Sequence, residues 1–203
     1  MIEPRSDSGT IESIDTTTTA KIAISTGARS LVLALLGATL FALLTFVGAN
    51  IRVPLYPVPI TMQTLFVLLA GAMLGARTGA LSQAVYIGMG VVGIPVFAGA
   101  IGAAAFFAAP TAGYLVGFVL AAFIVGRLID RKSTLLWHIT VFSIGSLIIL
   151  LLGVVHLAIV YTHSLSSAIA VGFLPFLLGD AVKVLAAASI YRSYLRLRQS
   201  RRL

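Results

Sequence analysis

The sequence predicts an all-α membrane protein with six transmembrane helices, and three observations support this fold class. Of the 203 residues, 59% are hydrophobic and only 10% are charged, and the mean hydropathy is +1.07. A water-soluble domain carries about 25% charged residues, so this composition excludes a soluble fold. Long apolar runs recur along the chain, and basic residues cluster where those runs end. Both patterns are typical of an integral membrane protein.

The chain is expected to form one membrane domain between two polar tails. Residues 1–28 are polar and Thr-rich, and they contain too little apolar surface to fold alone, which predicts a disordered cytoplasmic tail. A signal peptide is the competing interpretation, but the following apolar run is too long and no small-residue cleavage site stands out. Residues 29–195 are expected to form a six-helix transmembrane domain, and residues 196–203 a basic cytoplasmic tail.

Apolar runs and helix-breaking residues set the expected spans, because a helix needs roughly 20 apolar residues to cross a bilayer. Three prolines in residues 50–60 forbid a continuous helix there, and Pro175 interrupts the last apolar region. The expected spans are residues 31–49, 61–75, 78–92, 111–129, 137–161 and 176–195. Residues 165–174 are expected to form an outer loop or a short re-entrant piece.

The distribution of Lys and Arg predicts the orientation of these spans. Six spans place both termini on one side, and 12 of the 14 basic residues then fall on that side. The exceptions are Arg52, on the opposite face, and Lys183, within the membrane. The positive-inside rule therefore predicts that both termini of this multi-pass membrane protein are cytoplasmic.

Several functions are excluded by the residues that the chain lacks. It has no cysteine, no Gly-rich P-loop motif and no Ser/His/Asp or paired-carboxylate arrangement, so no enzyme and no cofactor is predicted. His138, His156 and His163 do not share a helix face at ligand spacing, so no metal site is expected. The net charge of +8 comes from basic residues at the ends of the apolar runs, where they set membrane orientation. No aromatic residues are interleaved with them, as nucleic-acid binding would require, so nucleic acid is not an expected partner.

Asp180 and Lys183 are the two ionisable residues expected inside the membrane. Burying such a group costs about 2.5–3.5 kcal/mol on insertion scales, so each is a functional candidate by default. Their spacing of three places both on one helix face. A structural ion pair is the alternative. The functional hypothesis is a polar anchor in which Asp180 accepts hydrogen bonds from ligand N–H groups and Lys183 donates to a carbonyl, as a cyclic urea or amide requires.

Other residues are weaker candidates for ligand contact. Arg52 lies in the Pro-stiffened outer segment, where its guanidinium suits a carboxylate; a solvated loop charge is the alternative. Gln63 and Gln83 are amides in apolar spans, and each must find a partner. Interhelical packing is favoured for Gln63, whereas packing and ligand contact, with Tyr86 one turn along, are equally supported for Gln83.

The uncharged loop at residues 93–110 is predicted to be a lid. It is longer and less polar than an ordinary connector. Its Phe97, Phe106 and Phe107 are expected to cover an apolar pocket, and Tyr114, just after it, is expected either to face that lid or to lie in the interfacial aromatic belt.

The first span carries Ala34, Ala38 and Ala42 at intervals of four residues. Such a ridge lets another helix approach closely, and a helix of a partner protein is the functional interpretation. Alanine is common in these spans, however, so a chance arrangement is the alternative.

Several separate motifs, in order, resemble the BioY family of biotin transporters. They are Pro57–Leu65 (PVPITMQTL), Gly71–Ser82 (GAMLGARTGALS), Gly93–Gly99 (GIPVFAG), Pro110–Phe118 (PTAGYLVGF) and Gly179-Asp180 followed by Lys183. The resemblance covers residues 30–190. BioY proteins are substrate-binding (S) components of energy-coupling factor (ECF) transporters, so the resemblance implies the six-helix S-component fold with biotin bound near the outer side.

The resemblance also implies roles for individual residues and for partners. Asp180 and Lys183 match the family's ligand-binding pair, and Arg52 matches the basic residue expected to meet the biotin carboxylate. Ala34 and Ala38 match the motif that contacts the transmembrane T component, which works with two ATPase subunits. Gln83 and Tyr86 lie where pocket residues of the third span are expected.

Three other functions remain open at this point. A small proton-coupled secondary transporter would use Asp180 as its proton site, and its uptake would collapse with an uncoupler yet persist without ATPase subunits. An S component for another vitamin is not excluded by the Asp/Lys pair alone. A purely structural membrane subunit would bind no ligand.

Overall fold

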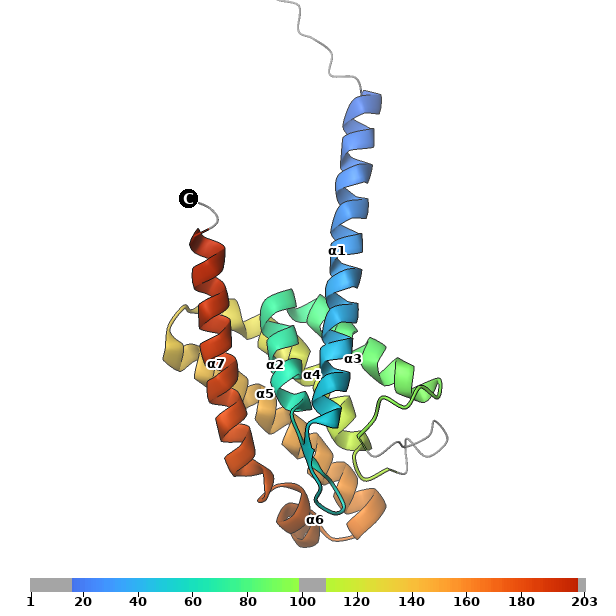
Figure 1. Cartoon of the computed structure of the whole chain (residues 1–203), viewed down its shortest axis with the longest axis vertical. Helices are drawn as coiled ribbons and strands as arrows, with labels where there is room; N and C mark the ends of the chain where they lie inside the picture. The colour runs from blue at the N-terminus through green and yellow to red at the C-terminus, as the bar shows by residue number, and fades with distance from the viewer. Residues whose placement is uncertain (1–15, 99–108, 201–203) are drawn as a thin grey trace, which may run out of the picture. The chain divides into compact units, whose positions relative to one another are not determined.

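The computed structural model describes residues 16–98 and 109–200, with side chains from residue 28 onward, and these residues are mostly helical (Figure 1). The chain divides into two units, Met1–Leu33 and Ala34–Leu203, and the second contains the helical bundle. The helices and strands are α1 (Thr16–Asn50), β1 (Arg52–Val53), β2 (Ile60–Thr61), α2 (Gln63–Leu74), α3 (Ala76–Val91), α4 (Ala112–Leu128), η2 (Ile129–Arg131), α5 (Leu135–His156), η3 (Leu157–Thr162), α6 (Leu165–Gly172) and α7 (Phe176–Ser200).

The lengths of the helices confirm an apolar helical protein. By length alone, however, fewer than six of them qualify as membrane spans. Three helical segments are long and apolar enough to cross a membrane: Ala28–Asn50, Ala112–Arg131 and Leu135–Thr162. α6 and α7 together form a fourth candidate, bent by 50° at the break before Phe176. α2 has 12 residues and α3 has 16, fewer than the roughly 20 that a full crossing requires.

The N-terminal helix is longer than the sequence predicts. α1 begins at Thr16, so residues 16–28, expected to belong to a disordered tail, are helical in the structure. A helix that the apolar run has already nucleated gains a hydrogen bond with each residue added, which lets it continue through poor helix formers. Residues 1–15 lie outside the described residues.

The Pro-containing segment after α1 is not helical, as predicted, but it contains a short hairpin that the sequence did not indicate. β1 and β2 pair antiparallel, with Arg52 opposite Thr61 and Val53 opposite Ile60. At the other break, the expected re-entrant piece is the eight-residue helix α6, whose first turn is capped by the Ser164 side chain. Pro175 has no N–H to donate, and it separates α6 from α7.

α4 lies at the centre of the second unit. It contacts α2, α3 and α5, whereas α7 packs against α2 and α5, and α6 folds against α5 and η3 (Figure 1). Buried residues form two apolar clusters, one of which includes Tyr86, Tyr114 and Phe118, and the other Leu68, Phe142 and Tyr191. The hairpin, α2, α4, α5 and α7 therefore surround a common interior.

Small residues allow the closest helix crossings in this unit. A Cβ atom at Gly71 of α2 would lie 3.0 Å from the Cα of Ala122 in α4, and one at Gly79 of α3 would lie 2.8 Å from the Cα of Gly71. Small residues at such crossings let backbones approach in lipid, where dispersion contacts drive association. Gly71 thus lies where three helices meet.

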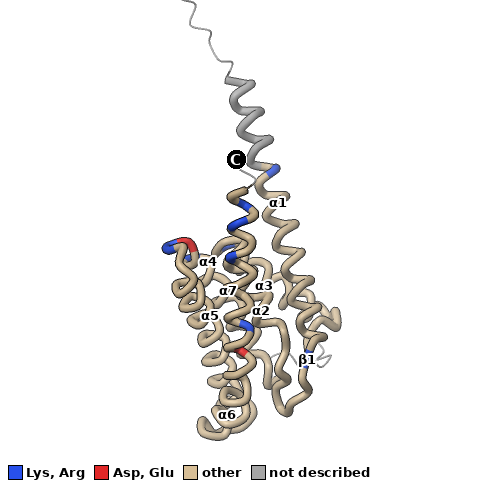
Figure 2. The backbone as a smooth tube through the Cα atoms, turned by 60° about the vertical axis from the view of Figure 1, so that its left-hand side comes forward, with Lys and Arg blue, Asp and Glu red and all other residues tan. Residues whose placement is uncertain are grey.

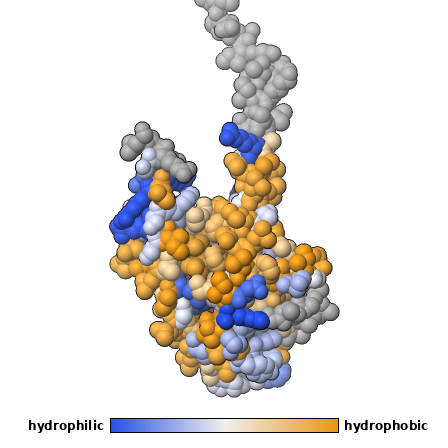
Figure 3. Space-filling view, viewed as in Figure 1, coloured by the Kyte–Doolittle hydropathy of each residue, from blue (hydrophilic) through white to orange (hydrophobic). Residues whose placement is uncertain are grey.

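The outer surface of the unit is apolar. Orange, apolar residues cover most of the face shown in Figure 3. On α7, Leu178, Val182 and Leu185 are 79%, 62% and 54% exposed, while Asp180 and Lys183 are buried on the opposite side of the helix. This inversion of the soluble-protein pattern is what a bilayer requires.

We predict that Gly71→Ala lowers the thermal unfolding midpoint of the purified protein in detergent by several degrees. Overpacking a tight contact costs typically about 1–3 kcal/mol, and the Ala122 backbone cannot move aside cheaply. Gly88→Ala is the matched control, because a Cβ atom there would meet nothing within 4 Å. Equal midpoints for the two variants would contradict the tight crossing.

Candidate ligand-binding site

A buried ion pair on α7 forms the polar end of the candidate site. Figure 2 colours the acidic and basic residues along the backbone. The Nζ atom of Lys183 donates to Oδ1 of Asp180 at 2.7 Å, and the two side chains are 5% and 7% exposed. Ser146 of α5 donates its hydroxyl to the other carboxylate oxygen, Oδ2, at 2.6 Å. The Lys183 ammonium has two further N–H donors, which have no protein acceptor among the described residues. The pair can therefore donate to a ligand without first breaking its own contact.

This pair lines a small, partly open cavity of about 40 Å³ between the helices. The cavity is lined by Val58, Pro59, Thr61, Gln63, Thr64, Phe97, Ala98, Thr111, Tyr114, Leu115, Phe118, Ile149, Leu150, Phe176, Asp180 and Lys183. Most of these are apolar, so the site combines apolar walls with one charged anchor.

Aromatic side chains set the shape of the cavity walls. Tyr114 of α4 stacks on Phe176 of α7 with ring centroids 5.9 Å apart, and its hydroxyl donates to the Gly172 carbonyl at 2.7 Å. Phe97, which follows α3, meets Tyr86 edge-on at 5.8 Å. The structure therefore brings four predicted residues to or beside one cavity: Asp180, Lys183, Phe97 and Tyr114.

Gln63, rather than Gln83, is the amide at the cavity. Gln63 Oε1 accepts from the Thr61 hydroxyl at 2.9 Å, and its Nε2 donates to the Tyr86 hydroxyl at 2.8 Å. Tyr86 donates in turn to the Val96 carbonyl at 2.9 Å. Tyr86 does not line the cavity but holds Gln63, which does. Gln63 thus makes the interhelical contact that the sequence favoured, and it also lines the cavity.

Gln83 has the packing role that was one of its two interpretations. Its side chain is fully buried, its Oε1 accepts from the Thr45 hydroxyl of α1 at 3.3 Å, and its Nε2 donates to Ser82 at 2.9 Å. It is absent from the cavity lining. Helical periodicity could not separate Gln63 of α2 from Gln83 of α3, because which helix each face meets depends on the tertiary packing.

Arg52 lies outside the cavity but next to it. It is exposed on β1 and lines a separate groove with Pro54, Leu55, Pro57, Pro59, Ala98, Pro110 and Thr111. Pro59, Ala98 and Thr111 line both hollows. The guanidinium and the ion pair are therefore placed on two neighbouring hollows that share a wall. Phe106 and Phe107 of the expected lid lie outside the described residues.

The alanine ridge on α1 faces into the bundle. Ala38 and Ala42 are 1% and 0% exposed, and Ala34 is half-buried. One turn from this ridge, a Cβ atom at Gly37 would lie 3.0 Å from Leu74 Cδ2 of α2. Ala38 is therefore covered by the chain's own helices, and the contact of Ala34 and Ala38 with a partner helix stays a prediction. Small residues let another helix approach closely, but they do not determine which helix it is.

The polar residues of the cavity do not form a metal site. Among the described residues, no group of three or more His, Asp or Glu side chains is close enough to hold a metal ion. His156 contacts the Ala109 carbonyl oxygen through Nε2 at 3.0 Å, and His138 packs edge-on against Tyr191 at 5.1 Å.

The chain combines an apolar helical exterior with an interior cavity that has one charged anchor. These features define a class of protein, the multi-pass membrane proteins that bind a small molecule inside a helical bundle. Within that class, the chain belongs to the BioY family, whose model matches residues 16–200.

Named relatives and one solved structure support this assignment. The chain is 43% identical over 156 residues to the biotin transporter BioY of Thermotoga maritima, covering 77% of this chain and 92% of the relative. It is 35% identical over 186 residues to the biotin transporter BioY of Rhodobacter capsulatus, covering 85% and 96%. The crystal structure of an S-component for biotin from an ECF-type ABC transporter has the same fold, with a TM-score of 0.73 and 23% identity over 84% of this chain and 93% of the other.

We predict that Lys183→Met destabilises the protein by about 3–5 kcal/mol, because it leaves the Asp180 carboxylate buried without a counter-charge. The double variant, which adds Asp180→Asn, is expected to recover much of the lost stability, because neither buried charge remains. Detergent-denaturant unfolding of the two single variants and the double variant measures this coupling. If the double variant lost the sum of the two single effects, the pair would not be coupled.

Proposed function

We propose that this chain binds biotin in the cavity described above and serves as the substrate-binding component of a biotin uptake system. The observation that carries the proposal is the buried Asp180–Lys183 pair on the wall of an apolar cavity. The relatives are named biotin transporters, and the family is one of transporters rather than enzymes. The protein belongs to the bacterial plasma membrane as a multi-pass protein.

The chemistry of biotin complements this arrangement. Its ureido ring has two N–H donors and a carbonyl, its fused rings and alkyl chain are apolar, and its tail ends in a carboxylate. Asp180 would accept from a ureido N–H and Lys183 would donate to the ureido oxygen, both as charge-assisted hydrogen bonds. Leu115, Phe118 and Ile149 line apolar wall against which the rings and chain can pack. Arg52, on the adjoining groove, would receive the carboxylate.

The ion pair argues against the proton-coupled alternative. Protonating Asp180 would leave Lys183 as a buried cation with no partner, which is a costly state in lipid. A purely structural subunit is also disfavoured, because it would not need an interior cavity with a charged wall.

We extend the proposal to topology and partners. α2 and α3 would each cross the membrane although they are short. α2 is almost entirely buried by other helices, and the irregular segments beside both helices line the cavity or its neighbouring groove, where non-helical backbone is tolerated. With α6 and α7 as one span, the count is six and both termini are cytoplasmic. The energising partners would be a transmembrane T component and two ATPases, in keeping with the ECF-type transporter whose S-component shares this fold.

We predict that the detergent-purified chain binds biotin in preference to thiamine and riboflavin, and that Asp180→Asn weakens biotin binding roughly tenfold to a hundredfold. A hydrogen bond to a charged group contributes about 1.5–3 kcal/mol. Calorimetric titration measures the affinity. Asp130→Asn is the matched control, because Asp130 is the one other acid beyond residue 15 and does not line the cavity. Unchanged affinity for biotin in a folded Asp180→Asn protein would show that Asp180 does not bind the ligand.

A second ligand, biotin methyl ester, distinguishes the contribution of Arg52 to the affinity from that of Asp180. We predict that Arg52→Gln weakens the binding of biotin but leaves that of biotin methyl ester unchanged, because the ester has no carboxylate to pair with the guanidinium. Asp180→Asn is expected to weaken both ligands, since both keep the ureido ring. An Arg52→Gln protein that lost affinity for both ligands equally would show that Arg52 acts on the protein and not on the carboxylate.

A further inference from the structure

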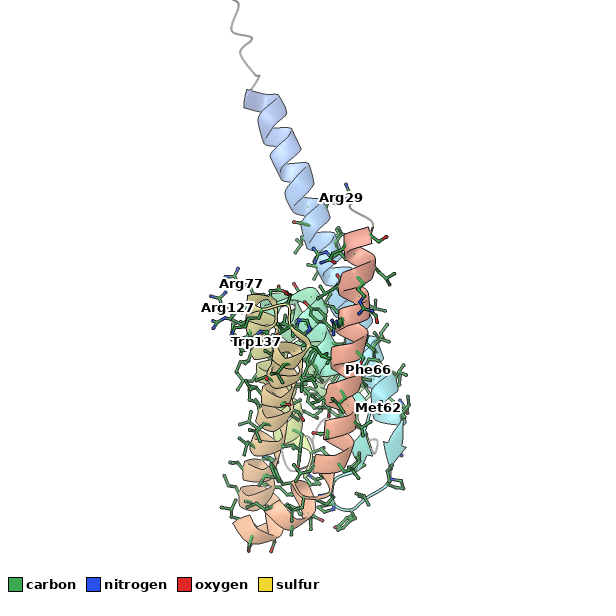
Figure 4. All side chains as sticks on the ribbon, turned by 90° about the vertical axis from the view of Figure 1, so that its left-hand side faces the viewer. Arg29, Met62, Phe66, Arg77, Arg127 and Trp137 are labelled. Atoms are coloured by element: carbon green, nitrogen blue, oxygen red, sulfur yellow. The ribbon has the colours of Figure 1, made fainter. Side chains whose placement is uncertain are left out.

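A basic groove lies at the end of the bundle where α2 turns into α3 and α4 ends in η2. Arg77, Arg127 and Arg131 line it, together with Asp130, Gly75 and Gly126. Figure 4 shows Arg77 and Arg127 side by side at this end, pointing away from the bundle. All three arginines are exposed, and none forms an ion pair within the described part of the chain. Asp130 accepts a hydrogen bond from the Tyr191 hydroxyl at 3.0 Å instead.

The backbone holds these arginines together. Gly75 has φ +80°, which favours glycine, and it makes the corner between α2 and α3. A Cβ atom at Gly126 would lie 2.7 Å from the Cα of Ala76, so only glycine lets α4 approach that corner. The first turn of α3 also lines the groove, and its unpaired N–H groups add partial positive charge. The groove is thus a built cationic feature at the end of two packed helices.

Apolar residues continue directly from the arginines along the outer surface. On α4, Phe123 and Leu120 precede Arg127 by four and seven residues, so they share its helix face, and they are 42% and 44% exposed. On α3, Leu81 follows Arg77 by four residues and is 42% exposed. Trp137, whose Nε1–H donates to the Leu128 carbonyl at 3.0 Å, lies at the same end, as a side chain at the membrane–water interface commonly does.

We propose that this groove binds the headgroup of an anionic phospholipid, with the phosphate held by Arg77, Arg127 and Arg131 and the acyl chains lying along Leu81, Leu120 and Phe123. The planar guanidinium group of an arginine can donate two parallel hydrogen bonds to the oxygens of a phosphate. A free anion would leave the apolar faces unused, and an acidic soluble protein would not reach them within the bilayer. A charged headgroup joined to hydrocarbon chains satisfies both parts of the surface.

Native mass spectrometry of the full chain, with phosphatidylglycerol or phosphatidylcholine added in detergent, tests the proposal. The wild type is expected to retain phosphatidylglycerol selectively, and Arg77→Gln/Arg127→Gln to bind it about tenfold more weakly. Arg196→Gln/Arg198→Gln is the control, because it removes the same charge from the exposed last turns of α7. Leu81→Gln/Phe123→Gln keeps every arginine, and it is also expected to weaken retention, which tests the site independently of the charge change.

Three results would overturn the proposal. Equal loss in both arginine variants would mean that net charge alone attracts the lipid. Equal retention of phosphatidylcholine would mean that the headgroup is not recognised. Displacement of phosphatidylglycerol by inorganic phosphate, with the Leu81→Gln/Phe123→Gln protein behaving as wild type, would mean that the groove binds a free anion.

Discussion

The buried pair of Asp180 and Lys183 constrains the structure around it. Neither charge is tolerable alone in a lipid-facing position, so the α7 face that carries them must turn inward. The same rotation exposes Leu178, Val182 and Leu185 to lipid. Ser146 must then come from α5 to satisfy the second carboxylate oxygen, at 2.6 Å. One ion pair thus sets the orientation of α7 and its contact with α5, and it places unused N–H donors on the cavity wall.

The fold forms a cavity by separating small and large residues on a single helix. On α4, Gly113, Gly117 and Ala121 follow one another at intervals of four and share one face. A Cβ atom at Gly117 would lie 2.9 Å from the Cα of Ile149, so this face lies tightly against α5. Tyr114 and Phe118, each one position further along, line the cavity. The small-residue face brings α4 and α5 together, and the rings of Tyr114 and Phe118 form part of the cavity wall.

Sequence reasoning located the apolar helices and the ion pair because both depend on local patterns. Apolar runs and prolines are visible along the chain, and a spacing of three defines a shared helix face regardless of what lies opposite. It could not choose between Gln63 and Gln83, or find that Ala38 is buried, because those outcomes depend on which helix becomes the neighbour. The β1–β2 hairpin was missed for another reason: each of its strands has two residues, too few to show alternation.

The positions of Asp180 and Arg52 imply a division of labour in the proposed binding mode. The anchor for the ring lies on long helices, where its geometry is fixed before any ligand arrives, so little ordering is needed on binding. The anchor for the carboxylate lies on a two-residue strand beside a Pro-containing turn, next to a groove that shares Pro59, Ala98 and Thr111 with the cavity. A ligand that reached both anchors would have to lie across this shared wall. A molecule with only the ring, or only the carboxylate, would engage one anchor. Discrimination between complete and partial ligands would then reside in the hairpin, whereas recognition of the ring would reside in α7.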